Sequence, residues 1–288
     1  MINLIFTIIL FNILIVIFKL FEKYQVDTLQ ALIINYLTAG ICAFLFIETK
    51  FSISYILQSQ WIYHAIIIGT LFMITFIVFS IGVQKIGISL TTITNKMSLI
   101  IPVCAALIFY PEKEKMTILK TVGLILAFVA IFLASTKSGK LIINKKYFWV
   151  VLILFFGQGI CDTIFNDFAQ IYSNTLSQDS YLFFMTLFFI ASLIGILIYI
   201  LKLNKKNIKF KNILWGIIFG IPNFFSLFFF LKVLANPKME SSDIFPLLSM
   251  GIVLTSAFIG WYIFKERISR NNWVGIILSI FAIYLLAY

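Results

Sequence analysis

Charged residues are scarce in this chain. They make up 11% of the 288 residues, whereas 62% of the residues are hydrophobic. A soluble globular domain carries about 25% charged residues, so this chain has too few polar groups to cover itself in water. The low charge therefore predicts an integral membrane protein. In a bilayer only helices or closed barrels satisfy every backbone polar group, and the apolar runs have about the 20-residue length of a membrane-spanning helix.

Histidine and cysteine are also rare, with one His and three Cys in the whole chain. Cys42, Cys104 and Cys161 lie far apart, each inside an apolar run, which indicates neither a disulfide framework nor a CxxC metal site. His64 alone cannot build a histidine-rich metal site. We therefore expect no metal and no cofactor. A Walker motif, an HExxH motif and a GxSxG motif are missing as well, so we expect neither direct ATP drive nor an enzyme.

The net charge of +11 does not indicate a nucleic-acid partner. The lysines lie in short gaps between apolar runs, as topology signals do. The chain has no basic helix interleaved with aromatic residues that could follow a phosphate backbone. We expect no binding to nucleic acid.

The apolar runs are separated by short polar segments and predict an all-α integral membrane protein with ten transmembrane helices. We place them at residues 2–20, 29–47, 61–83, 88–110, 117–135, 147–169, 180–201, 213–234, 241–264 and 272–288. A polar linker with several lysines, 136–146, divides them into two groups of five. The amino terminus has no basic segment and no small-residue cleavage site, so we expect a first membrane helix there and no cleaved signal.

The two groups of five look like copies of one another. Glu114 and Gly123 are separated by the same spacing as Glu266 and Gly275, because 123−114 and 275−266 are both 9. An odd number of helices per copy forces the two copies to insert in opposite orientations. We therefore expect two inverted five-helix repeats, 1–135 and 147–288, a pattern typical of transporters.

The distribution of basic residues predicts the orientation in the membrane. If the amino terminus is on side one, the alternating loops put five basic residues on side one and fifteen on side two. The positive-inside rule then places side two in the cytoplasm and both termini outside. Side one holds Lys50, Lys113, Lys115, Lys120 and Lys238; side two holds Lys19, Lys23, Lys85, Lys137, Lys140, Lys145, Lys146, Lys202, Lys205, Lys206, Lys209, Lys211, Lys265, Arg267 and Arg270.

Residues 94–103, with 112–114 and 121–126, resemble the EamA-type repeat of the drug/metabolite transporter superfamily. Residues 245–256 and 264–275 resemble the same repeat and also the last helices of small multidrug resistance proteins. The resemblance implies ten helices in two inverted repeats, a central cavity and alternating access, in a family that exports amino acids, metabolites or drugs, or exchanges sugar phosphates. It also implies cytoplasmic termini, which disagrees with the charge distribution. The first span lacks the glutamate that small multidrug exporters carry there.

Lys96 lies about eight residues into the fourth span, where an ionisable side chain is costly and is a candidate functional residue. Thr92 shares its helix face, and Asn95 adjoins it. Two interpretations remain open for Lys96: a site for a carboxylate or phosphate of the substrate, and a structural ion pair within the bundle.

Asp162 lies deep in the sixth span, between Gln158 and Asn166 on the same helix face. This polar stripe predicts a proton or cation site, or an ion pair. Our preferred hypothesis is a Lys96–Asp162 pair that breaks when substrate binds. Asp167 points about 100° away from Asn166, nearer the helix end, and we expect it at the membrane interface.

Four further residues are candidates for substrate binding. Asn35 and Tyr36 lie in the second span and Asn223 follows Pro222 in the eighth, where they could equally join helices to one another. Lys232 lies near the end of the eighth span, where it could bind substrate or extend to the interface. We expect most of the 33 phenylalanines to face lipid.

Together these observations predict a secondary transporter that moves a small metabolite or a drug by alternating access. The metabolite would be amino-acid-like or bear a carboxylate or phosphate. The partners would be this solute and the lipid bilayer of a bacterial cytoplasmic (inner) membrane; proton coupling and a homodimer remain open. Two alternatives also stay open: a lipid-carrier flippase and a membrane-embedded enzyme.

Overall fold

The computed structural model describes residues 2–48, 52–85, 91, 95–112, 116–135, 147–172, 179–201, 207–263 and 270–286. Thr92, Glu114, Glu266 and the linker 136–146 lie outside these residues. In the described part all elements are helices, which confirms the all-α class. They are α1 (Ile2–Lys23), α2 (Thr28–Leu45), α3 (Ile53–Gln58), α4 (Ile62–Lys85), α6 (Ile100–Phe109), α7 (Ile118–Ser135), α8 (Phe148–Tyr172), α9 (Asp179–Leu201), α10 (Phe210–Leu234), α11 (Ser241–Tyr262) and α12 (Arg270–Leu286).

Seven helices are long and apolar enough to cross a membrane: α1, α2, α4, α8, α9, α10 and α11. They coincide with seven of the ten expected spans. The fourth and fifth expected spans contain shorter apolar helices, Asn95–Phe109 and Ile118–Ala130, and the tenth overlaps the 17-residue helix α12. The chain is therefore a multi-pass integral membrane protein.

Polar side chains fix the connections near the helix ends. The Asp27 carboxylate accepts a hydrogen bond from the backbone N–H of Gln30 at 3.2 Å and caps α2. Gln25 adopts a positive φ of 49° in the short turn that connects α1 to α2, and both helices then pack on α10. Ser52 caps α3 in the same way, at 3.1 Å from Tyr55 N. The short helix α3 was not expected, because it lies in a polar connection.

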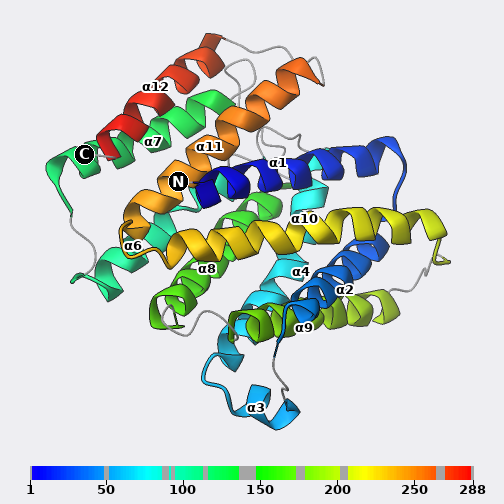
Figure 1. Cartoon of the computed structure of the whole chain (residues 1–288). Coiled ribbons are helices and arrows are strands. Elements are labelled where there is room, and N and C mark those ends of the chain that lie inside the picture. The colour runs from blue at the N-terminus through cyan, green and yellow to red at the C-terminus, as the bar shows by residue number, and fades with distance from the viewer. Residues whose placement is uncertain are drawn as a thin grey trace.

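Helices of each half of the chain pack on helices of the other half (Figure 1). Helix α4 packs on α8 and α9, whereas α10 packs on α1 and α2. Similarly, α6 packs on α8, and α11 packs on α1. Helices α2 and α9 pack against each other, and α7 and α12 form a separate pair at one edge of the bundle.

An ion-pair cluster attaches α7 to the start of α11. Lys120 Nζ lies 2.6 Å from a Glu240 carboxylate oxygen and 2.9 Å from one of Asp243. Lys120 is buried, so this contact offsets the cost of removing its charge from water. The cluster joins the first half of the chain to the second.

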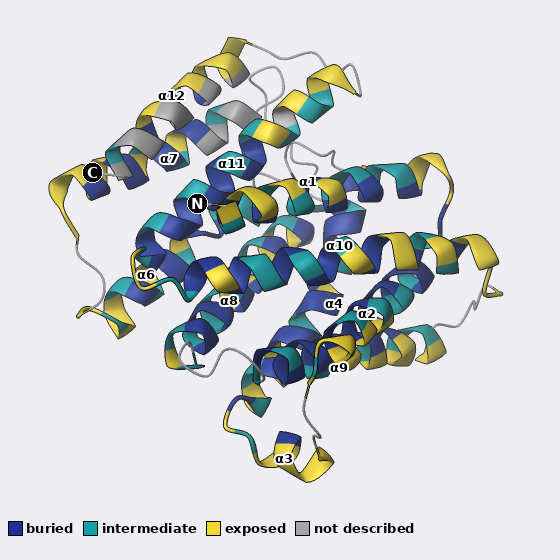
Figure 2. Ribbon diagram, in the orientation of Figure 1, coloured by how far each residue is buried: buried dark blue, intermediate teal, exposed yellow. Residues whose placement is uncertain are grey.

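Phenylalanines fill much of the interior, contrary to our expectation that most would face lipid. Eight are fully buried: Phe21, Phe165, Phe168, Phe183, Phe184, Phe188, Phe219 and Phe224. Figure 2 shows buried residues on the inner faces of the helices and exposed residues on the outer faces. Composition could not reveal this, since lipid and protein interior are equally apolar, and only helix packing decides which rings turn inward.

Glycines bring α10 and α2 into close contact. A Cβ atom at Gly216 would lie 2.7 Å from the backbone oxygen of Ala31, and one at Gly220 would lie 2.6 Å from that of Asn35. Gly216 and Gly220 are four residues apart and form a GxxxG motif, which lets membrane helices approach closely. This contact joins a helix of the first half to a helix of the second.

We expect Gly220→Ala to lower the free energy of unfolding by about 1–3 kcal/mol, because the added methyl group meets backbone that cannot rotate away. Thermal unfolding of the purified protein in detergent measures the effect. Gly251→Ala is the matched control: its Cβ would meet the terminal Cδ1 of Ile8, which can change rotamer. Equal losses in both variants would contradict the importance of the α2–α10 contact.

Candidate functional site

A cavity of about 60 Å³ lies inside the bundle, between the middle portions of α1, α4, α8 and α10 and the residues just ahead of α6. Six polar side chains and seven phenylalanines are among its lining residues. The polar ones are Thr75, Asn95, Lys96, Gln158, Asp162 and Asn223. This volume has room for a few water molecules, so a larger solute requires the helices to move apart.

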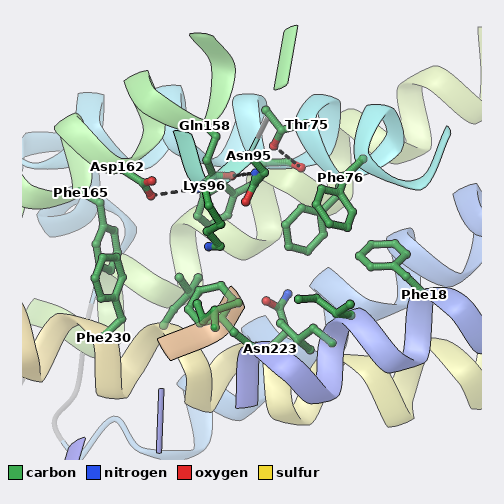
Figure 3. Close-up of a pocket in the computed structure, with 17 residues that line it drawn as sticks. Phe18, Thr75, Phe76, Asn95, Lys96, Gln158, Asp162, Phe165, Asn223 and Phe230 are labelled. Carbon is green, nitrogen blue, oxygen red and sulfur yellow. Dashed lines mark hydrogen bonds between the residues drawn. The ribbon is translucent and has the colours of Figure 1, made fainter. Parts of the chain in front are cut away.

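The polar wall is a chain of hydrogen bonds between α8 and the segment ahead of α6. Asn95 Nδ2 donates to Gln158 Oε1 at 3.1 Å, and Gln158 Nε2 donates to Asp162 Oδ1 at 2.9 Å. The spacing of four residues places Gln158 and Asp162 on one face of α8. The amide thereby orients the carboxylate toward the cavity (Figure 3).

Lys96 follows Asn95 in the segment ahead of α6 and reaches into the same cavity, beside Gln158 (Figure 3). Its ammonium group lies 5.1 Å from the ring centre of Phe11, within the range of a cation–π contact. Among the described residues Lys96 and Asp162 form no direct ion pair within 4.0 Å. Both charged groups therefore face a shared space that an additional molecule could occupy.

Two buried amides meet behind the cavity wall. Asn223 of α10 donates to Asn35 Oδ1 of α2 at 3.1 Å. The hydroxyl of Tyr36, next along α2, donates to the backbone oxygen of Phe72 at 2.9 Å. These bonds tie α2 to α10 and to α4 and so support the helices that line the cavity.

Aromatic rings bound the cavity at both ends (Figure 3). Toward the carboxyl ends of α8 and α10, Phe165 stacks on Phe230 with ring centres 5.4 Å apart. Toward the carboxyl ends of α1 and α4, Phe18 contacts Phe76 and Phe79 at 5.7 and 5.6 Å. The cavity is therefore enclosed between two ring layers.

The structure brings together five of the residues that the sequence predicted for substrate binding: Asn95, Lys96, Gln158, Asp162 and Asn223. Asn35 and Tyr36 lie behind them, while Thr92 lies outside the described residues. The other two candidates lie elsewhere. Asn166 accepts a hydrogen bond from Ser241 at 2.8 Å, and Lys232 is exposed with its ammonium over the ring of Phe228 at 4.2 Å.

Sequence reasoning missed the aromatic lining, Thr75 and a second polar cluster. In that cluster His64 Nε2 lies 2.8 Å from Asp167 Oδ2, and the hydroxyl of Tyr110 donates to Asp167 Oδ1. Each residue stands near a helix end, where the sequence alone indicates only an interface. Among the described residues no three His, Cys, Asp or Glu side chains gather as metal ligands.

The chain is similar to several known proteins. Residues 146–288 match the EamA-like transporter family. A protein of Haemophilus influenzae, described only as uncharacterized, is 30% identical over 293 residues, covering 99% of this chain and 97% of its own. A protein of known crystal structure has 10% sequence identity but a TM-score of 0.74, covering 99% of this chain and 94% of that one. This last likeness concerns the fold alone.

We expect Asn223→Leu to lower the free energy of unfolding by about 1–3 kcal/mol, because it leaves a buried amide oxygen of Asn35 without its donor. Adding Asn35→Leu should cost less than the sum of the two single changes, since no amide then remains unpaired. Denaturation of the purified variants measures this double-mutant cycle. Strictly additive losses would show that the two amides do not interact.

Proposed function

Because the chain belongs to the EamA-like transporter family, we propose that it is a secondary transporter that carries a small solute through its central cavity. The observation that supports this most is the presence of one ammonium group and one carboxylate on the walls of a ring-lined cavity. Each charge costs about 2.5–3.5 kcal/mol to place in a membrane helix. A purely structural helix bundle in lipid does not need buried charges, whereas a site that binds a charged solute does.

The lining defines the chemistry of the solute. Lys96 supplies an ammonium group for a carboxylate or phosphate, and Asp162 supplies a carboxylate for an amine. The phenylalanines supply an apolar surface for the rest of the molecule. An amino-acid-like solute with an apolar side chain meets all three, whereas a sugar phosphate would leave Asp162 without a partner.

Substrate binding would rearrange the charges. Without substrate, the Lys96 ammonium lies over the ring of Phe11, and the Asp162 carboxylate accepts a hydrogen bond from Gln158. An entering carboxylate would draw Lys96 from the ring, and an entering amine would share Asp162 with the amide. Proton coupling belongs to the proposal as well, since a carboxyl group at this position can bind a proton when no amine is present.

The exchange of helix partners supports two inverted repeats, 1–135 and 147–288. Suppose that α1, α2, α4, α6 and α7 correspond, in this order, to α8, α9, α10, α11 and α12. The equivalent of the α4–α8 contact is then the α10–α1 contact, and both occur. The contact of α6 with α8 likewise becomes that of α11 with α1. Ten spans would complete this arrangement. The excess of basic residues on side two favours the cytoplasm for that side, whereas the family resemblance favours cytoplasmic termini.

The two ring layers supply gates for alternating access. Phe165 and Phe230 come from α8 and α10, the first and third membrane-spanning helices of the second half. Phe18 and Phe76 come from α1 and α4, the first and third membrane-spanning helices of the first half. Inverted repeats put equivalent pairs at opposite ends of the cavity. Opening one pair while the other stays closed would expose the site to one side at a time.

We expect a solute with a carboxylate or phosphate to stabilise the purified protein in a thermal-shift screen of amino acids, nucleosides, sugar phosphates and drugs. Lys96→Gln should weaken the apparent affinity by about 10- to 100-fold, because a charge-assisted hydrogen bond is lost. The same variant should abolish transport in proteoliposomes. Lys238→Gln, which removes an exposed lysine, is the matched control.

Normal transport by Lys96→Gln would overturn this assignment. A second comparison separates binding from a structural ion pair. If the two charges serve only to stabilise the bundle, exchanging them in Lys96→Asp with Asp162→Lys should restore both folding and transport. If they bind substrate, the exchanged protein should fold but not transport.

We expect the two ring layers to control access from opposite sides. A thiol at Thr75→Cys, with the three native cysteines replaced, reports access to the cavity. Phe165→Ala should speed its reaction with an impermeant maleimide added on the side where α8 ends. Phe18→Ala should speed the reaction from the other side. Faster labelling from the same side in both variants would contradict separate gates.

A further inference from the structure

A second cavity of about 350 Å³ lies between α4 and α6, both of which pack on α8. It is much larger than the central cavity and falls within the range of pockets that hold small ligands. We call it the lateral groove. Its polar end contains His64, Tyr110 and Asp167, and Ile67, Ala105 and Ile164 line the portion one helical turn deeper.

The lateral groove has the polarity gradient of a membrane interface. Its polar end lies where α4 begins and where α6 and α8 end. Trp61, Tyr63, Tyr110 and Tyr172 stand at these same helix ends, and such residues gather at the level of lipid headgroups. The apolar portion therefore extends toward the hydrocarbon. An amphiphile with its polar group at the interface matches this arrangement.

The described lining residues of the groove include one carboxylate, Asp167, and no lysine or arginine. His64 Nε2 contacts Asp167 Oδ2 at 2.8 Å, while among the described residues the buried Nδ1 of His64 has no hydrogen-bond partner. Because the partner of Nε2 is a carboxylate, Nε2 carries the hydrogen and donates it to Asp167.

Asp167 also retains capacity to accept hydrogen bonds. A carboxylate offers about four acceptor positions, and His64 and Tyr110 use one on each oxygen. The Asp167 side chain is still 39% exposed although it lies at the floor of the groove. A cation with N–H donors can therefore reach it without displacing either neighbour.

We propose that the lateral groove binds a phospholipid through a primary ammonium headgroup, with Asp167 as the acceptor. An ethanolamine headgroup carries both the positive charge and the N–H donors that Asp167 can accept. A choline headgroup carries the same charge but no N–H donor. The acyl chain lies along the apolar portion of the groove. The lateral groove and the central cavity are separate sites with different lining residues.

The test compares two lipids that differ only in the headgroup nitrogen. The full-length protein, purified in detergent, is mixed with equal amounts of phosphatidylethanolamine and phosphatidylcholine of identical acyl chains, and the bound lipids are counted by native mass spectrometry. We expect phosphatidylethanolamine to be favoured about fivefold, which corresponds to about 1 kcal/mol. Asp167→Asn, which preserves the shape, should reduce the ratio to about one.

Two further variants keep the outcome interpretable. Ala105→Trp fills the groove without touching the polar end and should reduce binding of both lipids, whereas Ile108→Trp, on the outer face of the same helix, should not. Asp179→Asn removes another carboxylate near a helix end, one that accepts from Tyr55 at 2.8 Å outside the groove, and should leave the ratio unchanged.

Equal binding of the two lipids by the unaltered protein would overturn the proposal. A preference for phosphatidylcholine would also overturn it, because the choline group would then be bound by the aromatic rings of the groove and not by hydrogen bonds to Asp167. Retention of the fivefold preference in Asp167→Asn would show that another group reads the headgroup. None of these results tests the role of Lys96 in transport, which the proteoliposome assay measures separately.

Discussion

Two opposite charges in the middle of an apolar bundle constrain the arrangement of the helices around them. Lys96 and Asp162 line a cavity with room for only a few water molecules, so protein groups must supply most of the contacts that stabilise their charges. The ring of Phe11 faces the ammonium group, and Gln158 donates to the carboxylate while it accepts from Asn95. These contacts require α1, α8 and the segment ahead of α6 to meet at one level. Removing any partner would leave a charge less well compensated.

Close packing determines which parts of the bundle can move. Gly216 and Gly220 place the backbone of α10 against that of α2, and the Asn35–Asn223 bond crosses the same contact. Because the glycines bring backbone against backbone, this contact has little freedom to rearrange, and we expect α2 and α10 to move together. Rings, in contrast, can change rotamer and slide over one another. The Phe165–Phe230 and Phe18–Phe76 contacts are therefore the places where the cavity can open with least disruption.

The sequence predicted the helical class and the two charged residues of the site. The first follows from the apolar composition, and the second from ionisable residues that interrupt apolar runs. An ionisable residue within an apolar run stands out, as Lys96 and Asp162 do. Asn166 shares a helix face with Asp162, yet it lies one turn beyond, past the level of Phe165, and contacts Ser241. Lys232 faces outward and Phe11 faces the cavity because of how each helix is rotated about its axis. That rotation depends on packing against helices far away in the chain. His64, Tyr110 and Asp167 come from three separate helices and could not be joined by sequence spacing.

Helix α8 is common to both sites and links them mechanically. Asp162 faces the central cavity, and Asp167, five residues further on, faces the lateral groove across about 140° of the helix. A rotation or tilt of α8 that separates Phe165 from Phe230 must also shift Asp167 relative to His64 and Tyr110. A lipid held by Asp167 would therefore favour whichever position of α8 keeps the groove intact. By linkage, a ligand that favours one position changes the affinity of the other site, so the composition of the bilayer becomes a determinant of how readily the cavity opens.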